Sequence, residues 1–163
     1  MKTVIVLAAL ALAPAAHAQI SCVELTLVLQ SGASNFEQLK GAPAEGEKDI
    51  WLASFSLPGA GQCDVIRGAA DAWFYSCAAG SKTEARATSA FNEGLASVAS
   101  CLSSWTRQPV GNSSSPGKVL DSVAFIGADA NRGFTVQLER VELDDKQAGK
   151  FWVFSTVIER RPG

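Results

Sequence analysis

Alternating apolar and polar residues predict a β-hairpin in the middle of the chain, around which the other elements can be arranged. The two strands are expected at 63–67 and 72–78, with the turn near Ala70. Pairing them around this turn places three pairs of residues directly opposite each other: Cys63 with Cys77, Val65 with Tyr75, and Arg67 with Trp73. Opposite residues of an antiparallel pair lie within disulfide reach, so the register predicts a Cys63–Cys77 bridge.

The segment that follows has the spacing of a long amphipathic helix, from about Lys82 to Trp105. Apolar residues recur every three or four positions and form one stripe: Ala87, Phe91, Leu95, Val98, Leu102 and Trp105. Ser81 and Glu84 have the spacing of an N-terminal capping box. Residues 108–117 are rich in Ser, Pro and Gly and are predicted to form a surface loop.

Period-two alternation also predicts strands before and after this central unit. One is expected at 50–57, and three more at 119–127, 133–143 and 150–159, joined by turns at 128–133 and 144–149. The last strand is apolar on both faces, which indicates a central position in the sheet. A polar loop with Gly and Pro is expected at 41–48.

Residues 23–40 fit two patterns. Val23, Leu25 and Leu27 alternate as in a strand, but Leu25, Leu29 and later apolar residues also have helical spacing. A capping-box spacing at Ser34 and Glu37 favours helix, broken into two pieces near Ser31-Gly32. The predicted fold is therefore α+β, in the order helix-β-β-β-helix-β-β-β, with two helices on one face of an antiparallel sheet. This order suggests two similar halves, although no residue-level repeat is present.

The first 18 residues have the pattern of a secretory signal peptide. Lys2 precedes an apolar run that is too short to span a membrane, and Ala16 and Ala18 provide a cleavage site before Gln19. Cleavage would leave 145 residues (163 − 18) at 19–163, the size of one domain, in the periplasm or outside the cell. The only histidine, His17, would be removed with the signal.

The net charge and the cysteine content argue against some classes of function. The mature chain would carry 13 basic (14 minus Lys2) and 16 acidic residues, a net charge of −3, which argues against nucleic acid as the partner. Four cysteines in an exported chain of this size indicate two disulfides rather than a metal site. With Cys63 joined to Cys77, the second bridge would be Cys22–Cys101, and no thiolate would remain.

Known catalytic arrangements are largely excluded. Without histidine, the mature chain cannot form a Ser-His-Asp triad or a Cys-His pair, and paired cysteines leave no zinc site. No phosphate-binding glycine motif is present, so no cofactor is expected. Carboxylate catalysis would need two acids at a suitable separation; the candidates are Glu139, Glu142, Asp144 and Asp145. Solvated turn residues at 144–145 and exposed charges on the sheet are, however, the favoured explanation of these four residues.

Aromatic residues are the better indication of function. Trp73 lies near the predicted hairpin tip opposite Arg67, where a cation–π pair is expected, and Tyr75 is two residues further along. Trp, Tyr and Arg are the residues that most often anchor protein interfaces. Arg67, Trp73 and Tyr75 are therefore the candidate interface.

The sequence thus favours an exported, non-enzymatic module that binds a protein or another macromolecule of the cell envelope. An inhibitor, an immunity-type protein and a subunit of an envelope assembly all fit this description. Two alternatives remain open at this point. One is a small envelope hydrolase that uses carboxylates, and the other is a domain that binds a small apolar ligand between helices and sheet.

Overall fold

A computed structural model describes residues 19–110, 117–145 and 149–161. The predicted signal peptide, residues 111–116 of the predicted surface loop and residues 146–148 of the last turn lie outside the described residues. The described residues form two α-helices and eight strands. In chain order these are α1 (Cys22–Gly32), β1 (Lys40–Pro43), β2 (Ile50–Ala53), β3 (Gln62–Arg67), β4 (Trp73–Ser81), α2 (Glu84–Cys101), β5 (Thr106–Pro109), β6 (Lys118–Ile126), β7 (Phe134–Asp145) and β8 (Gly149–Arg160).

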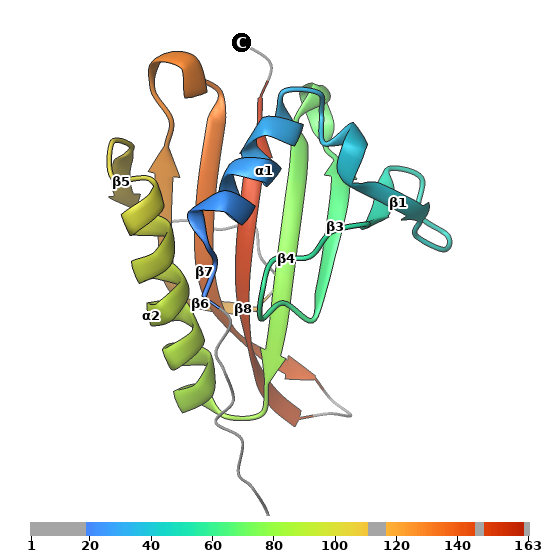
Figure 1. Ribbon diagram of the computed structural model, residues 1–163. Helices are drawn as coiled ribbons and strands as arrows, with labels where there is room; N and C mark the ends of the chain where they lie inside the picture. Colours follow the sequence, from blue (N-terminus) through green and yellow to red (C-terminus); the bar gives the residue numbers. More distant parts are fainter. Residues whose placement is uncertain (1–18, 111–116, 146–148, 162–163) are drawn as a thin grey trace, which may run out of the picture.

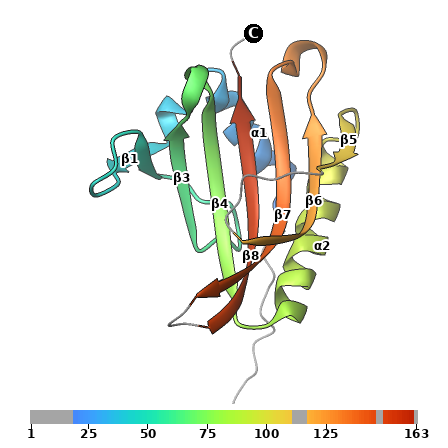
Figure 2. The ribbon, with the colours of Figure 1, turned by 180° about the vertical axis from the view of Figure 1, so that it is seen from behind.

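The strands form one antiparallel sheet in the order β1-β2-β3-β4-β8-β7-β6-β5. Both α-helices cover one face of the sheet (Figure 1), and neither of them lies over the other face (Figure 2). This arrangement confirms the α+β class and the helices on one face. Each helix is followed by four strands, and the two four-strand units join where β4 pairs with β8. The two halves suggested by the sequence are therefore a repeat of topology.

The central hairpin has the predicted register. Cys63 pairs with Cys77, Val65 with Tyr75 and Arg67 with Trp73. The last strand, β8, lies between β4 and β7, as its two apolar faces predict.

The first helix is shorter than the sequence pattern predicts. Helix α1 begins with a capping box formed by Ser21 and Glu24, and it ends at Gly32. A β-carbon at Gly32 would collide with the Phe134 ring, so the glycine permits a close approach of helix and sheet. The predicted capping box at Ser34 and Glu37 is wrong, because the intervening backbone turns through left-handed conformations and only a short 3₁₀ helix (Glu37–Leu39) follows.

The two outermost strands, β1 and β5, are missing from the prediction. They comprise only Lys40–Pro43 and Thr106–Pro109, and the four residues of β5 are all exposed. Neither segment alternates in hydrophobicity, because neither buries one face. They are strands because β2 and β6 offer them backbone hydrogen-bonding partners. The strand predicted at 50–57 is shorter in the structure and ends at Ala53, after which Ser54 N donates to Leu39 O.

Helix α2 begins at Glu84 and ends at Cys101, inside the predicted range. The expected Ser81–Glu84 capping box is wrong, because the Ser81 hydroxyl bonds to the backbone of Thr83. The buried face includes Phe91, Gly94 and Val98, while Leu95 is only partly buried. A β-carbon at Gly94 would lie 2.6 Å from the Phe154 ring, so this glycine brings the helix close to β8.

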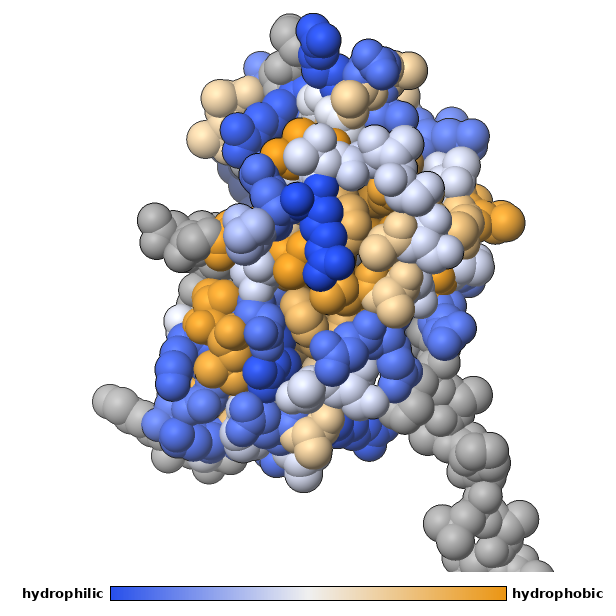
Figure 3. Space-filling model, turned by 90° about the vertical axis from the view of Figure 1, so that its left-hand side faces the viewer, coloured by the Kyte–Doolittle hydropathy of each residue, from blue (hydrophilic) through white to orange (hydrophobic). Residues whose placement is uncertain are grey.

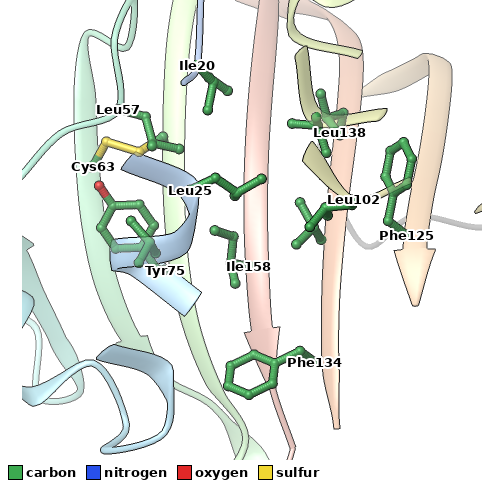
Figure 4. Close-up of a cluster of buried hydrophobic side chains, with 14 of the residues drawn as sticks. Ile20, Leu25, Leu57, Cys63, Tyr75, Leu102, Phe125, Phe134, Leu138 and Ile158 are labelled. Atoms are coloured by element: carbon green, nitrogen blue, oxygen red, sulfur yellow. A yellow bond between two sulfur atoms is a disulfide. The ribbon is translucent and has the colours of Figure 1, made fainter. Parts of the chain in front are cut away.

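The core lies between the two helices and the sheet (Figure 4). Leu57, Cys63 and Tyr75 occupy one end of the cluster in this view, Leu25 and Ile158 the middle, and Leu102, Leu138 and Phe125 the other end. One hydrophobic cluster therefore runs through both halves.

Two disulfides cross-link the elements around this core, and they are the pairs favoured by the sequence. Cys63–Cys77 links β3 to β4, and Cys22–Cys101 links the start of α1 to the end of α2 with a Cα–Cα distance of 5.1 Å. All four cysteines are thus paired. Disulfides of this kind are typical of proteins that work outside the reducing cytosol. None of the described helices is long and apolar enough to cross a membrane.

Candidate functional site

Arg67 and Trp73 form the expected cross-strand pair at the tip of the β3–β4 hairpin. The guanidinium carbon of Arg67 lies 5.9 Å from the centroid of the Trp73 ring, within the range of a cation–π interaction. Trp73 is only partly buried, so its ring contributes both to the edge of the core and to the surface. The hairpin tip therefore presents an aromatic ring whose position is fixed by its neighbours.

A second tryptophan and a lysine extend this pair into a cluster. Trp51 of β2 stacks on Trp73 with ring centroids 5.8 Å apart. The Lys40 ammonium lies 4.5 Å from the Trp51 centroid and 4.2 Å from the Trp73 centroid. The Lys40 side chain is only 14% exposed, so its aliphatic part is covered. We call Lys40, Trp51, Arg67 and Trp73 the cation–aromatic cluster.

Sequence reasoning missed half of this cluster. Lys40 falls in the segment predicted as helix, and Trp51 is explained equally well as a core residue. The β2–β3 register places Trp51 opposite Val65, which itself pairs with Tyr75 next to Trp73 on the same face. Pairing β2 with β3 in the correct register would have predicted that Trp51 and Trp73 lie close together. The sequence does not determine how β2 pairs with β3.

Tyr75, the third candidate interface residue, does not lie at the surface. Its side chain is fully buried, its ring centroid lies 6.1 Å from that of Phe36, and its hydroxyl donates a 2.8 Å hydrogen bond to Phe55 O. Burial raises the pKa of this phenol well above its usual value of 10.0. Tyr75 therefore supports the hairpin from the core side and is not available to a partner.

We expect Tyr75→Phe to lower the free energy of unfolding by about 1–2 kcal/mol, because the buried Phe55 carbonyl loses its donor. Burial of the phenol also makes stability depend on alkaline pH. The folded protein holds the proton more tightly than the unfolded chain does, so this contribution is complete below pH 10.0 and is lost as pH rises above it. Urea titrations between neutral pH and pH 11 should show a smaller alkaline loss for Tyr75→Phe than for the wild type. An identical loss would contradict the assignment.

Beside the cation–aromatic cluster lies an open hollow of about 320 Å³. Three segments form its wall: the loop after α1, the β3–β4 hairpin tip and the end of β8, which meet at one end of the molecule (Figure 1). The lining residues are Asn35, Arg67, Asp71, Trp73 and Arg160. We call this feature the hairpin hollow. No sequence signal predicts it, because its residues are up to 125 positions apart (160 − 35).

The charges in the hollow are partly paired. Arg67 Nη2 donates to Asp71 Oδ1 at 2.9 Å, and this hydrogen bond raises the pKa of Arg67. Arg160 lies opposite both Trp73 and Phe134, with its guanidinium carbon 5.5 Å from the Phe134 centroid. Arg160 forms no ion pair with any residue that the structure describes. Within the described chain, the Arg160 guanidinium therefore packs against an aromatic ring and has no carboxylate partner.

Backbone strain concentrates around this hollow. In the described chain, five non-glycine residues have positive φ, and four of them lie in its two loops: Asn35, Phe36, Ala70 and Asp71, with φ between 53° and 57°. A left-handed conformation costs Phe36 and Ala70 on the order of 1 kcal/mol each, whereas Asn and Asp adopt it more readily. Strain of this kind collects at functional sites because the surrounding structure holds side chains in positions that relaxed backbone would not allow.

The carboxylates considered for catalysis do not converge. Glu139 and Glu142 are three residues apart on β7, so their side chains leave opposite faces of the sheet. Glu139 is buried and accepts hydrogen bonds from Ser122 and Gln137, whereas Glu142 pairs with Lys150, which lowers the pKa of Glu142. Asp144 lies on the same side of the sheet as Glu142, and its negative charge helps to raise the pKa of Lys150. The Asp145 side chain lies outside the described part of the structure. Within the described ranges, no group of three potential metal ligands is present.

Two other surfaces have fewer features of a binding site than the hairpin hollow has. A groove of about 200 Å³ lies between α2, β4 and the segment at Gln19 and Ile20. Around α2 and β5, hydrophobic side chains reach the surface in patches that hydrophilic residues interrupt (Figure 3). Neither surface combines aromatic rings, unpaired charge and strained backbone as the hairpin hollow does.

Comparisons with protein-family models, with curated proteins and with solved structures find no match, so the function has to be inferred from this chain's own residues.

Proposed function

We propose that the chain is an exported, non-enzymatic binding module that holds a protein partner through the hairpin end of its sheet. The observation that carries the proposal is the cation–aromatic cluster beside the hairpin hollow. Two stacked indoles and two cations are partly accessible there, next to an arginine without an ion pair among the described residues. Tryptophan and arginine are the side chains whose loss most often weakens protein complexes.

Preorganisation supports a binding role for this end of the molecule. The Cys63–Cys77 bridge and the hydrogen bond of the buried Tyr75 hydroxyl fix the conformation of the β3–β4 hairpin. The hairpin therefore loses little conformational entropy when a partner docks. The two disulfides suit a compartment outside the cytosol, and the proposed localisation is the periplasm or the medium, after cleavage following Ala18. Inhibition, immunity and envelope assembly all remain compatible with such a module.

The decisive experiment compares three forms of the tagged mature protein, each exported to its native compartment and recovered with whatever remains bound. They are the wild type, the Arg67→Ala, Trp73→Ala double variant, and a control with Leu27→Ala and Arg107→Ala. The control removes an exposed apolar residue and an exposed arginine away from the hairpin end. Thermal unfolding of all three forms shows whether the fold is retained.

We expect a stoichiometric protein partner with the wild type and the control, and its loss from the double variant. Loss of such an anchor pair typically weakens a complex by more than about 2 kcal/mol, roughly thirtyfold in Kd. A partner retained equally by all three forms would place the interface elsewhere. If no form retains a partner, the binding function itself is contradicted.

A further inference from the structure

The hairpin hollow has the charge balance of a site for one negative charge. Its two guanidinium groups, Arg67 and Arg160, face one carboxylate, Asp71, which leaves a formal charge of +1. Arg67 already donates to Asp71, whereas Arg160 pairs with no acid in the described chain. An incoming anion would therefore meet Arg160 first.

Aromatic neighbours hold the Arg160 side chain in place, and no described carboxylate neutralises its charge. It sits at the end of β8, between Trp73 on one neighbouring strand and Phe134 on the other. Its side chain is partly buried, and its guanidinium carbon lies 5.5 Å from the Phe134 ring centroid. An aromatic ring can fix a guanidinium group and leave its edge donors available. The planar edge matches a carboxylate, which can accept two parallel hydrogen bonds.

We propose that the hairpin hollow binds a single carboxylate, that of an Asp or Glu side chain on the protein partner. Arg160 is the main donor, and the Asn35 amide, which also lines the hollow, supplies a further one. The Trp73 ring borders the hollow and receives the aliphatic part of the acidic side chain. This inference rests on the proposed function and specifies its chemistry: the docking segment of the partner carries an acidic residue.

The surroundings favour a carboxylate over a more highly charged anion. Asp71 is part of the wall, and Asp49 is close enough to Arg67 to raise its pKa. Both acids would repel a dianionic phosphate more strongly than they would repel a singly charged carboxylate. The arrangement of Arg67 and Asp71 is also an internal example of the proposed contact, because the chain itself places a carboxylate against one of the two arginines.

The test uses the isolated mature protein and needs no partner. The probe is N-acetylglutamic acid α-amide, which carries one carboxylate, and the control probe is the neutral N-acetylglutamine α-amide. Two-dimensional NMR follows the indole N–H of Trp73 and the Nε–H of Arg160 during each titration. Inorganic phosphate is titrated separately, and thermal unfolding of every variant confirms that it folds.

We expect saturable shifts at Trp73 and Arg160 with the acid, at a Kd in the millimolar range, and no saturable shift with the amide. Arg160→Gln should weaken binding at least tenfold, whereas the control Arg107→Gln, an exposed arginine on β5, should leave the Kd unchanged. No saturable shift with the acid, an equal response to the amide, or phosphate binding tenfold tighter than the acid would each overturn the carboxylate assignment. An equal effect of Arg107→Gln would show general charge attraction and would also overturn it.

The two proposals can fail separately. If the titration fails but a partner is lost when Arg67 and Trp73 are substituted, the interface stands and its carboxylate chemistry falls. If the acid binds at Arg160 but no form of the protein retains a partner, the carboxylate site stands and the protein-binding function falls.

Discussion

The Cys22→Ala, Cys101→Ala double variant is expected to lose about 4.5 kcal/mol of unfolding free energy. The bridge spans 79 positions, so in the chain-entropy model its removal gives the unfolded chain a large increase in freedom. The bridge also joins the start of α1 to the end of α2, which belong to different halves of the topological repeat. Its loss removes the disulfide cross-link between the two helices. Urea unfolding of wild type and variant measures the difference.

The matched comparison is the Cys63→Ala, Cys77→Ala double variant. This bridge spans 14 positions, and the same model gives about 3 kcal/mol. Without this bridge, β3 and β4 still pair with each other through their backbones, and β4 still pairs with β8. A hairpin variant that is less stable than the helix variant would contradict the loop-length argument.

Phe91→Ala is expected to be the most damaging single substitution in α2, with a loss of about 3–5 kcal/mol. Phe91 is 5% exposed, and its ring meets the Phe154 ring edge to face with centroids 6.3 Å apart. Truncation leaves a cavity between α2 and β8, and Gly94 offers no side chain that could fill it. Denaturant unfolding of the variant gives the loss directly.

Val23→Ala provides the control for that substitution. Val23 lies on α1 and is 78% exposed, so its replacement should change stability by less than about 0.5 kcal/mol. A loss at Phe91 below about 1 kcal/mol would mean that α2 does not pack on the sheet through this face.

The elements that could be predicted are those whose pattern is local. The β3–β4 hairpin follows from period-two alternation on both sides of one turn, and its register then sets the Cys63–Cys77 pair. Helix α2 follows from an apolar stripe, because a helix that covers a sheet must bury one side. The central place of β8 follows from apolar residues on both of its faces.

Where local patterns competed with packing, packing decided. The spacing around Ser34 and Glu37 is that of a helix start, yet the fold needs Phe36 in the core beside Tyr75 and accepts left-handed backbone at Asn35 and Phe36 to place it there. Likewise, alternation indicates that Trp73 and Tyr75 share a face but not how far the helices extend over it. Tyr75 is covered and Trp73 is not, and this difference separates a core residue from a candidate binding residue.

By itself, the sequence determined the α+β class, the hairpin register and the Cys63–Cys77 pair, because periodicity acts over short distances. The Cys22–Cys101 pair, 79 positions apart, followed from the sequence only as the two cysteines left over. The tertiary structure alone decided the two edge strands, which exist through backbone pairing and carry no hydrophobic pattern. It also decided the hairpin hollow, where Asn35, Asp71 and Arg160 meet from three separate segments. Such a site depends on long-range register, and no local pattern of residues encodes it.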